Sequence, residues 1–160
     1  MNIFLLDYDL TVNATYYINR HVVKQPLEAA QLLCTARQLV GDGGGKYDAT
    51  HVYNSITRWL CQSTENYKWL CELSLQLCKE YTFRYDKTLA CQKVIEDCEL
   101  HPINRPGEFS YHPPAMPDDC KVDDIVESYR KYYITHKVYD KSGRFQAYWY
   151  YRNKPDWFVI

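Results

Sequence analysis

The stretch His21-Val22-Val23-Lys24-Gln25-Pro26-Leu27-Glu28-Ala29-Ala30-Gln31-Leu32-Leu33-Cys34, which runs on through Ala36 to Leu39, decides how this chain folds. Its apolar residues recur close to helical spacing, at Leu27, Ala30, Leu33, Cys34 and Leu39. This spacing predicts a helix that buries one stripe in a core. In a helix continuous from His21, the residues His21, Lys24 and Glu28 fall on one neighbouring face. An imidazole, an amine and a carboxylate would then lie within reach of one another.

Pro26 leaves two courses open for this helix. Proline lacks an N–H group and clashes with the carbonyl four residues back, so the helix is either kinked at Pro26 or begins near Gln25 with Pro26 in its first turn. In the second case, His21 and Lys24 lie at the entrance to the helix rather than on its flank.

The rest of the chain predicts a mainly α protein. Periodic and capping signals indicate further helices from Asp7 or Asp9 to 18, and over residues 54–61, 63–84, 88–98 and 123–133. Residues 1–6 form a short apolar run that is extended or a strand. Residues 99–119 form a long Pro-rich loop, and the tail after His136 is an aromatic strap with a turn at 140–143. We expect a single compact helical domain over residues 1–160.

Composition narrows the possible functions. The 19 Lys and Arg residues against 20 Asp and Glu residues give a net charge of −1, which argues against a protein that binds DNA non-specifically through its whole surface. A local basic cleft remains possible, and its candidate members are Arg20, Lys24, Arg58, Lys68, Arg84 and Lys87. The 16 Tyr residues suit core filling, interfaces and base stacking alike.

The seven cysteines include no Cys-x-x-Cys pair, and no His lies at finger-like spacing. We therefore predict small buried cysteines in a reducing cytoplasm, with no metal site and no cofactor. The apolar N-terminal run lacks a basic leader and is followed by Asp7 and Asp9, so we expect no signal peptide, no membrane span and an intracellular protein.

Several short segments are typical of one family. They are Asn2-Ile3-Phe4 with Leu6-Asp7, His21-Val22-Val23-Lys24 with Glu28, Gln31 to Ala36, Ala49-Thr50-His51, Trp59, Asn66-Tyr67, Trp69-Leu70, Glu80-Tyr81, Arg84-Tyr85, Ala115 to Asp118, Lys121 to Asp124, Tyr129-Arg130, Tyr132-Tyr133 and Trp157-Phe158. In these segments the chain resembles a family of small tailed-phage proteins.

More remotely, the order of elements resembles the pyrimidine-dimer DNA glycosylases of the endonuclease V type. That resemblance implies a compact all-α fold, an N-terminal segment threaded between helices, and a Tyr-rich tail that meets DNA. The family's catalytic Arg and Glu would fall near Lys24 and Gln25, and Asn2 stands where the family exposes a nucleophilic Thr. In this chain, Lys24 would have to act as the amine nucleophile, with His21 nearby and Glu28 or His51 moving the proton. The alternative is an ordinary surface pair between Lys24 and Glu28, worth about 0.3–0.5 kcal/mol.

A second group of residues suits a nucleotide or an extruded base. Arg84 with Tyr81, and Arg130 with Tyr133, pair a phosphate-binding fork with a stacking ring, and Asn66 lies on the same predicted helix as Arg84. Each Arg is equally suited to holding a helix carboxylate.

Two functional hypotheses follow. The first is a DNA- or nucleotide-acting phage protein, such as a glycosylase/lyase for a modified or damaged base. The second is a non-catalytic binding protein of the anti-defence type, which masks a host factor or sequesters a nucleotide signal. Metal-dependent hydrolysis has little support, since the His and acidic residues lack ligand spacing.

Overall fold

The computed structural model describes residues 2–41 and 43–160; Met1, which opens the predicted extended segment, and Asp42 lie outside the described residues. The helices are α1 (Leu10–Tyr16), α2 (Asn19–Val40), α3 (Ser55–Leu60), α4 (Thr64–Tyr85), α5 (Gln92–Leu100), the 3-10 helix η1 (Asp118–Cys120) and α6 (Ile125–His136). The described residues contain no strand, apart from an isolated antiparallel bridge between Tyr139 and Phe145. The prediction of a mainly α fold is confirmed.

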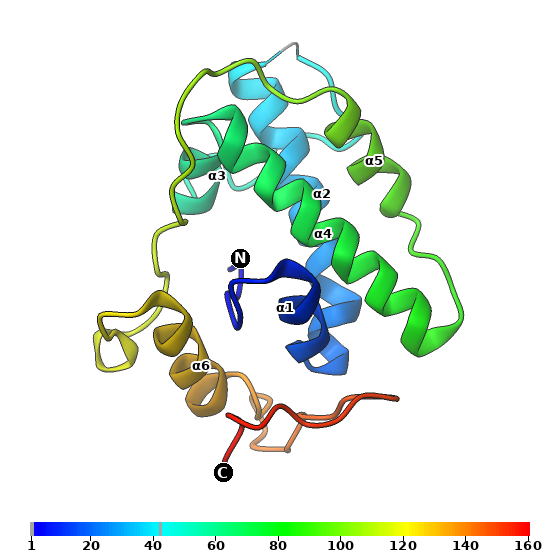
Figure 1. Cartoon of the computed structure of the whole chain (residues 1–160). Helices are drawn as coiled ribbons and strands as arrows, with labels where there is room; N and C mark the ends of the chain where they lie inside the picture. Colours follow the sequence, from blue (N-terminus) through cyan, green and yellow to red (C-terminus); the bar gives the residue numbers. More distant parts are fainter. Residues whose placement is uncertain (1, 42) are drawn as a thin grey trace.

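Helices α2 and α4 are the longest and run side by side, with α5 packed against both (Figure 1). Ser63 caps α4 by accepting a hydrogen bond from the backbone N–H of Asn66 at 3.1 Å. Leu33 and Leu70, at the centre of the two predicted apolar stripes, are at most 1% exposed. The prediction is wrong for the first and last residues of the α2 stripe, since Leu27 and Leu39 are 44% and 45% exposed. These two helices therefore form the framework on which the remaining segments pack.

Helix α2 runs through Pro26, so the alternative in which it begins near Gln25 is wrong. The start of the helix has no side-chain cap of its own. Instead, the backbone N–H of Asn19 donates to the carbonyl of Tyr148 at 2.8 Å, and that of Ile18 donates to the hydroxyl of Tyr133 at 3.0 Å. Because these partners come from distant parts of the chain, local sequence signals could not place the first turn.

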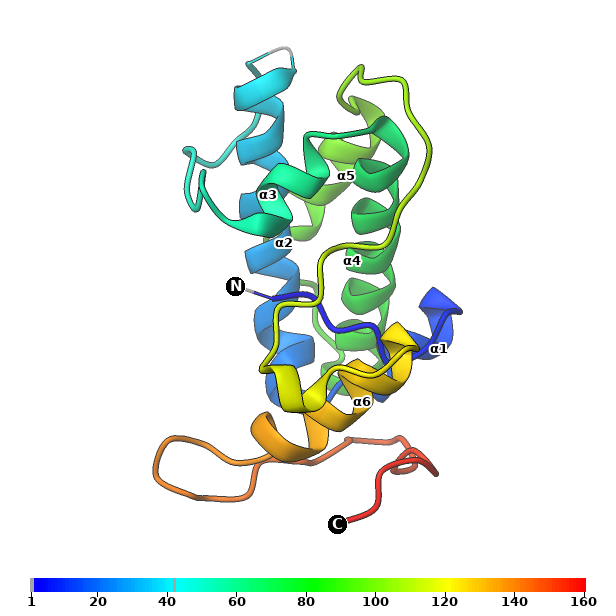
Figure 2. The ribbon, with the colours of Figure 1, turned by 90° about the vertical axis from the view of Figure 1, so that its left-hand side faces the viewer.

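The N-terminal segment is extended and passes between α2 and α6 (Figure 2). Its residues Phe4 and Leu6 are buried, so their backbone groups need partners. Tyr17 exchanges two hydrogen bonds with the backbone of Phe4, at 3.0 and 2.6 Å, and Asn13 accepts from the N–H of Leu6 at 2.8 Å. Side chains of α1 and the residue after it thus replace the neighbouring strand that this segment lacks, while Asp9 caps α1 as expected.

The Pro-rich loop lies along the α3 and α4 side of the molecule and is held by a few specific contacts. The indole of Trp59 donates to the carbonyl of Ser110 at 2.8 Å, and the side chain of Asn66 accepts from the N–H of Ser110 at 2.9 Å. The predicted helix 88–98 is wrong at its start, because α5 begins only at Gln92. Cys91 precedes it without a side-chain cap.

The aromatic tail returns from α6 to the start of α2, where the carbonyl of Tyr148 accepts the hydrogen bond from Asn19. Trp149 donates to the carbonyl of Tyr16 at 2.9 Å, and Phe158 is 2% exposed against the core. The predicted turn at 140–143 is present, with the N–H of Gly143 donating to the carbonyl of Asp140 at 3.0 Å. The tail is therefore an integral layer of the fold, running below α6 in both views (Figures 1 and 2).

All seven cysteines are free, and six of them are buried. This agrees with the prediction that they serve as small apolar residues. Among the described residues, no helix combines the length and the apolar character that a membrane crossing requires.

Candidate functional site

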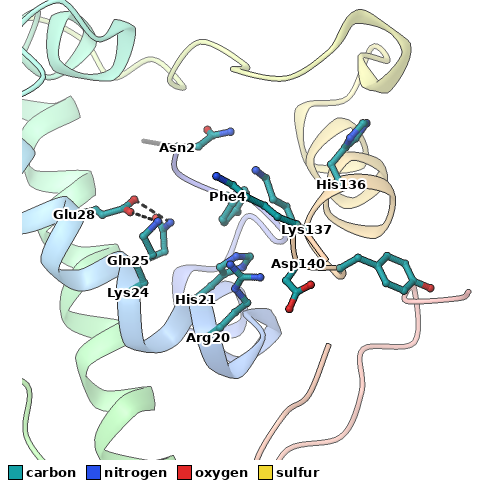
Figure 3. Close-up of a pocket in the computed structure, with 12 residues that line it drawn as sticks. Asn2, Phe4, Arg20, His21, Lys24, Gln25, Glu28, His136, Lys137 and Asp140 are labelled. Atoms are coloured by element: carbon teal, nitrogen blue, oxygen red, sulfur yellow. Dashed lines mark hydrogen bonds and ion pairs between the residues drawn. The ribbon is translucent and has the colours of Figure 1, made fainter. Parts of the chain in front are cut away.

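A pocket of about 290 Å³ opens between the first three turns of α2, the N-terminal segment and the chain that leaves α6 (Figure 3). We call it the basic pocket, because four cationic side chains and only two carboxylates line it: Arg20, Lys24, Lys137 and Lys141 against Glu28 and Asp140. Cavities of this size are at the small end of those that hold small molecules.

Both carboxylates are already engaged by the protein. Glu28 lies 2.8 Å from the ammonium of Lys24, in an i, i+4 pair. Asp140 organises the turn that follows it, accepting hydrogen bonds from the hydroxyl and the N–H of Ser142 and from the N–H of Arg144. These contacts hold the pKa of Asp140 below its usual value, the Ser142 hydroxyl contributing most. Among the described residues, neither carboxylate forms an ion pair with Arg20, Lys137 or Lys141.

Arg20 and Lys141 carry the uncommitted positive charge of the pocket. Both are exposed, and neither has an ion pair or side-chain hydrogen bond with another described residue. Lys137 is held differently, because its ammonium lies 4.8 Å from the ring centre of Tyr132. The pocket therefore presents at least two cationic groups to an incoming anion.

His21 lies at the base of the pocket and is 6% exposed. Burial, with Arg20 the largest of the nearby charges, lowers the pKa of His21 to about 3, so the imidazole is neutral near pH 7. Its Nδ1 lies 2.7 Å from the hydroxyl of Tyr133, which already accepts from Ile18. The proton of this buried hydroxyl has no other acceptor among the described residues, so we infer that it is donated to Nδ1 and that the ring proton resides on Nε2. Nε2 has no hydrogen-bond partner among the described residues, which leaves an N–H donor for a ligand.

The predicted catalytic residues separate into two places. His21, Lys24 and Glu28 line the basic pocket together, as the helical spacing indicated. His51 does not line it. It is exposed at a left-handed backbone position with φ of 53°, and its carbonyl accepts from the hydroxyl of Thr57 at 2.9 Å. In this arrangement, His51 shapes the turn before α3.

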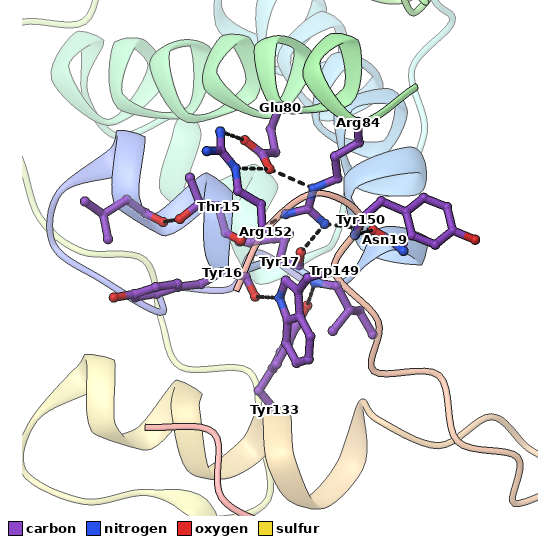
Figure 4. Close-up of polar contacts among 12 residues, drawn as sticks. Thr15, Tyr16, Tyr17, Asn19, Glu80, Arg84, Tyr133, Trp149, Tyr150 and Arg152 are labelled. Atoms are coloured by element: carbon purple, nitrogen blue, oxygen red, sulfur yellow. Dashed lines mark hydrogen bonds and ion pairs between the residues drawn. The ribbon is translucent and has the colours of Figure 1, made fainter. Parts of the chain in front are cut away.

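Arg84 is buried in a network of protein contacts (Figure 4). Its guanidinium donates to Glu80 at 2.7 Å, to the side-chain oxygen of Asn19 at 3.0 Å and to the carbonyls of Tyr17 and Thr15 at 2.8 and 2.9 Å. We call the group formed by the buried Glu80 and Arg84 and the exposed Arg152 the Glu80 lock. It joins α4 to the end of α1 and to the tail.

Arg152 completes the Glu80 lock from the tail. Its guanidinium donates to both carboxylate oxygens of Glu80, at 3.0 and 2.9 Å, and the hydrogen bond raises the pKa of Arg152. Tyr81, the ring predicted to work with Arg84, instead lies 4.9 Å from the ring of Tyr85. Arg84 and Tyr81 thus do not form a fork and ring around one open cavity.

The other predicted nucleotide-binding residues also serve the fold. Asn66 holds the Pro-rich loop, as described above. Arg130 donates to the carbonyl of Leu6 at 2.9 Å and pairs with Glu127 at 2.9 Å. Tyr133 is fully buried and meets the pocket only through its hydrogen bond to His21.

Lys137 and Lys141 line the basic pocket although the sequence did not indicate them, whereas the predicted Arg58, Lys68 and Lys87 do not line it. Lys137 precedes the tail turn and Lys141 lies in it, more than a hundred residues after Arg20. The turn signal around Gly143 was visible in the sequence, but the return of the tail to α2 was not. Comparison of the chain with protein-family models, with curated proteins and with solved structures finds no match in any of the three.

Proposed function

We propose that this protein binds a 5′-phosphorylated nucleotide in the basic pocket. The observation that carries the proposal is the pair of exposed, uncommitted cations, Arg20 and Lys141, beside the free Nε2–H of the neutral His21. A guanidinium offers two parallel donors to a phosphate, an ammonium adds a point charge, and the imidazole N–H adds a neutral donor at the base.

The size and the rim of the pocket favour a nucleotide over a bare phosphate. About 290 Å³ is more than a phosphate needs and too little for a length of duplex. Tyr139 lines the same pocket and is 47% exposed, so its ring is available to stack on a base. The net charge of −1 agrees with local phosphate recognition in place of binding along a DNA backbone.

The position of Lys24 favours binding over lyase chemistry. A lyase needs an amine that burial and neighbouring cations have made neutral and nucleophilic. The side chain of Lys24 is 65% exposed and forms an ion pair with Glu28. Of the two functional hypotheses, the structure therefore supports the non-catalytic, nucleotide-sequestering one better.

The test is a calorimetric titration with a nucleoside and with its 5′-monophosphate, at two salt concentrations. We expect binding of the monophosphate only, weakened by added salt because phosphate contacts are screened. A 5′-phosphorylated single strand, titrated in parallel, distinguishes a free nucleotide from a strand end. Equal binding of nucleoside and monophosphate, or binding of neither, would overturn the proposal.

Borohydride trapping on abasic DNA examines the lyase alternative in the same preparation. We expect no covalent adduct. An adduct that disappears in Lys24→Ala would assign the protein to the glycosylase/lyase class instead.

A further inference from the structure

A second group of chemically active side chains lies where η1 meets the end of α6. The ligand atoms of Asp119, Cys120 and His136 all lie within 4.8 Å of one another. Asp119 and Cys120 are neighbours in η1, whereas His136 is the last residue of α6. Because the fold and not the sequence spacing brings them together, the sequence analysis predicted no metal site.

Few hydrogen bonds within the described residues occupy these three groups. The carboxylate of Asp119 and the ring nitrogens of His136 have no hydrogen-bond partner among the described residues. The nearby ammonium of Lys131 donates to the backbone carbonyl of Asp119, which leaves the carboxylate free. The Cys120 sulfur has one polar neighbour, the hydroxyl of Thr135 at 3.6 Å. Since that hydroxyl donates to the carbonyl of Lys131 at 2.8 Å, Thr135 accepts from the thiol.

We propose that Asp119, Cys120 and His136 bind a zinc ion. One sulfur, one nitrogen and one oxygen donor form a mixed set that suits Zn²⁺, whereas Ca²⁺ and Mg²⁺ prefer oxygen donors alone. Zinc bond lengths of about 2.0–2.3 Å place tetrahedral ligand atoms roughly 3.5 Å apart. Asp119 and His136 are exposed, so rotation of their side chains can close the remaining distance around the buried sulfur.

Binding the ion has a defined proton balance. The Cys120 thiol loses its proton to solvent as the sulfur–zinc bond forms, and zinc keeps a +2 charge that the thiolate and the carboxylate offset. Thr135 is then placed to redirect its hydroxyl proton toward the thiolate, a supporting contact typical of metal sites. Three protein ligands leave a fourth position for water or another ligand.

His136 connects this site to the basic pocket, which it also lines. Figure 3 shows its ring at the end of α6, apart from the labelled pocket residues Arg20 and His21. Asp119 and Cys120 do not line the basic pocket, and Arg20, His21 and Lys141 are not among the proposed zinc ligands. The site is thus distinct from the proposed nucleotide contacts and does not depend on them.

The test is zinc titration of metal-free protein against a competing chromophoric chelator, with His136→Ala and Asp119→Ala as the variants. Both side chains are exposed, so the variants should keep the fold. We expect one zinc ion per chain, and at least about tenfold weaker binding in each variant.

The chain offers matched controls for this titration. His101 is also an exposed histidine beside a carboxylate, 3.1 Å from Asp97, and Cys61 is the one cysteine that is not buried. His101→Ala and Cys61→Ser should leave zinc affinity unchanged. In the cobalt-substituted protein, a thiolate-to-metal charge-transfer band should be present and should be lost in Cys120→Ser. Absence of zinc binding, or equal affinity in His136→Ala, Asp119→Ala and the controls, would overturn the proposal.

Discussion

Asn19 and Arg20 are neighbours in the chain, yet they belong to two regions that use positive charge in opposite ways. Asn19 faces the Glu80 lock, where Arg84 is 3% exposed and each contact of its guanidinium is a protein group. Arg20 faces the basic pocket, where two cations have no partner among the described residues. The comparison teaches that the partners of a cation, and not its charge alone, decide what it does in this chain. Arg84 and Arg152 share Glu80 and fasten the fold, whereas Arg20 and Lys141 have no such partner among the described residues.

Breaking the Glu80 lock should give the largest effect on stability. In Glu80→Ala, the guanidinium of Arg84 remains buried without its carboxylate, which costs about 3–5 kcal/mol of unfolding free energy. Chemical denaturation followed by circular dichroism measures this loss. Glu65→Ala is the matched control on the same helix, because Glu65 is half exposed and lies 3.5 Å from Lys68. A similar loss of unfolding free energy in both variants would show that the Glu80 lock contributes no more than an exposed ion pair.

Acid should destabilise the protein through His21. The folded protein protonates this imidazole only near its lowered pKa of about 3, while the unfolded chain does so near the ordinary histidine pKa of 6.5. Below pH 6.5 the unfolded state binds more protons than the folded state. The contribution of His21 to stability is therefore fully present above pH 6.5 and decreases as the pH falls. Between pH 7 and pH 5, the expected loss from one such group is about 2 kcal/mol.

His21→Gln separates this contribution from that of other groups. His112, whose pKa burial lowers to about 4, acts in the same direction and remains in the variant. Denaturation at both pH values should show a smaller pH dependence in His21→Gln than in the unaltered protein. An unchanged dependence would mean that His21 is protonated equally readily in the folded and unfolded states.

Removal of the Lys24 charge should give the smallest change in stability. Lys24 is exposed, and its pair with Glu28 is of the i, i+4 type that contributes about 0.3–0.5 kcal/mol. Denaturation of Lys24→Met should therefore give nearly the same midpoint as the unaltered protein. A loss above about 1 kcal/mol would place Lys24 with the buried, fold-fastening cations.

The sequence predicts the helical framework well because its signals are local. Asp9, Asn54 and Ser63 each cap a helix as expected. The apolar spacing marks much of the buried face of α2 and α4, but it wrongly includes Leu27 and Leu39, which are exposed. The first turn of α2 was left open because its partners, in Tyr133 and Tyr148, come from more than a hundred residues away. The predicted helix 88–98 begins too early because its apolar spacing includes Leu89, whereas α5 begins only at Gln92.

The site was predictable only in part, for the same reason. Helical spacing alone places His21, Lys24 and Glu28 together, and the structure agrees. Nothing in the local sequence distinguishes Arg84 from Arg20. Only the packing of α1 and the tail makes Arg84 a buried arginine and leaves Arg20 exposed. Lys141 joins Arg20 because the tail folds back, which no local pattern encodes.

The most direct measurement compares two double variants that remove the same charge. Arg20→Ala/Lys141→Ala takes both uncommitted cations from the basic pocket, and Arg58→Ala/Lys93→Ala takes two exposed cations from α3 and α5. Calorimetric titration with a nucleoside 5′-monophosphate should show at least about tenfold weaker binding in the first, or about 1.4 kcal/mol, and unchanged binding in the second. Both double variants should have a free energy of unfolding within about 0.5 kcal/mol of that of the unaltered protein. Equal affinities in the two double variants would contradict the assignment of the basic pocket as the binding site.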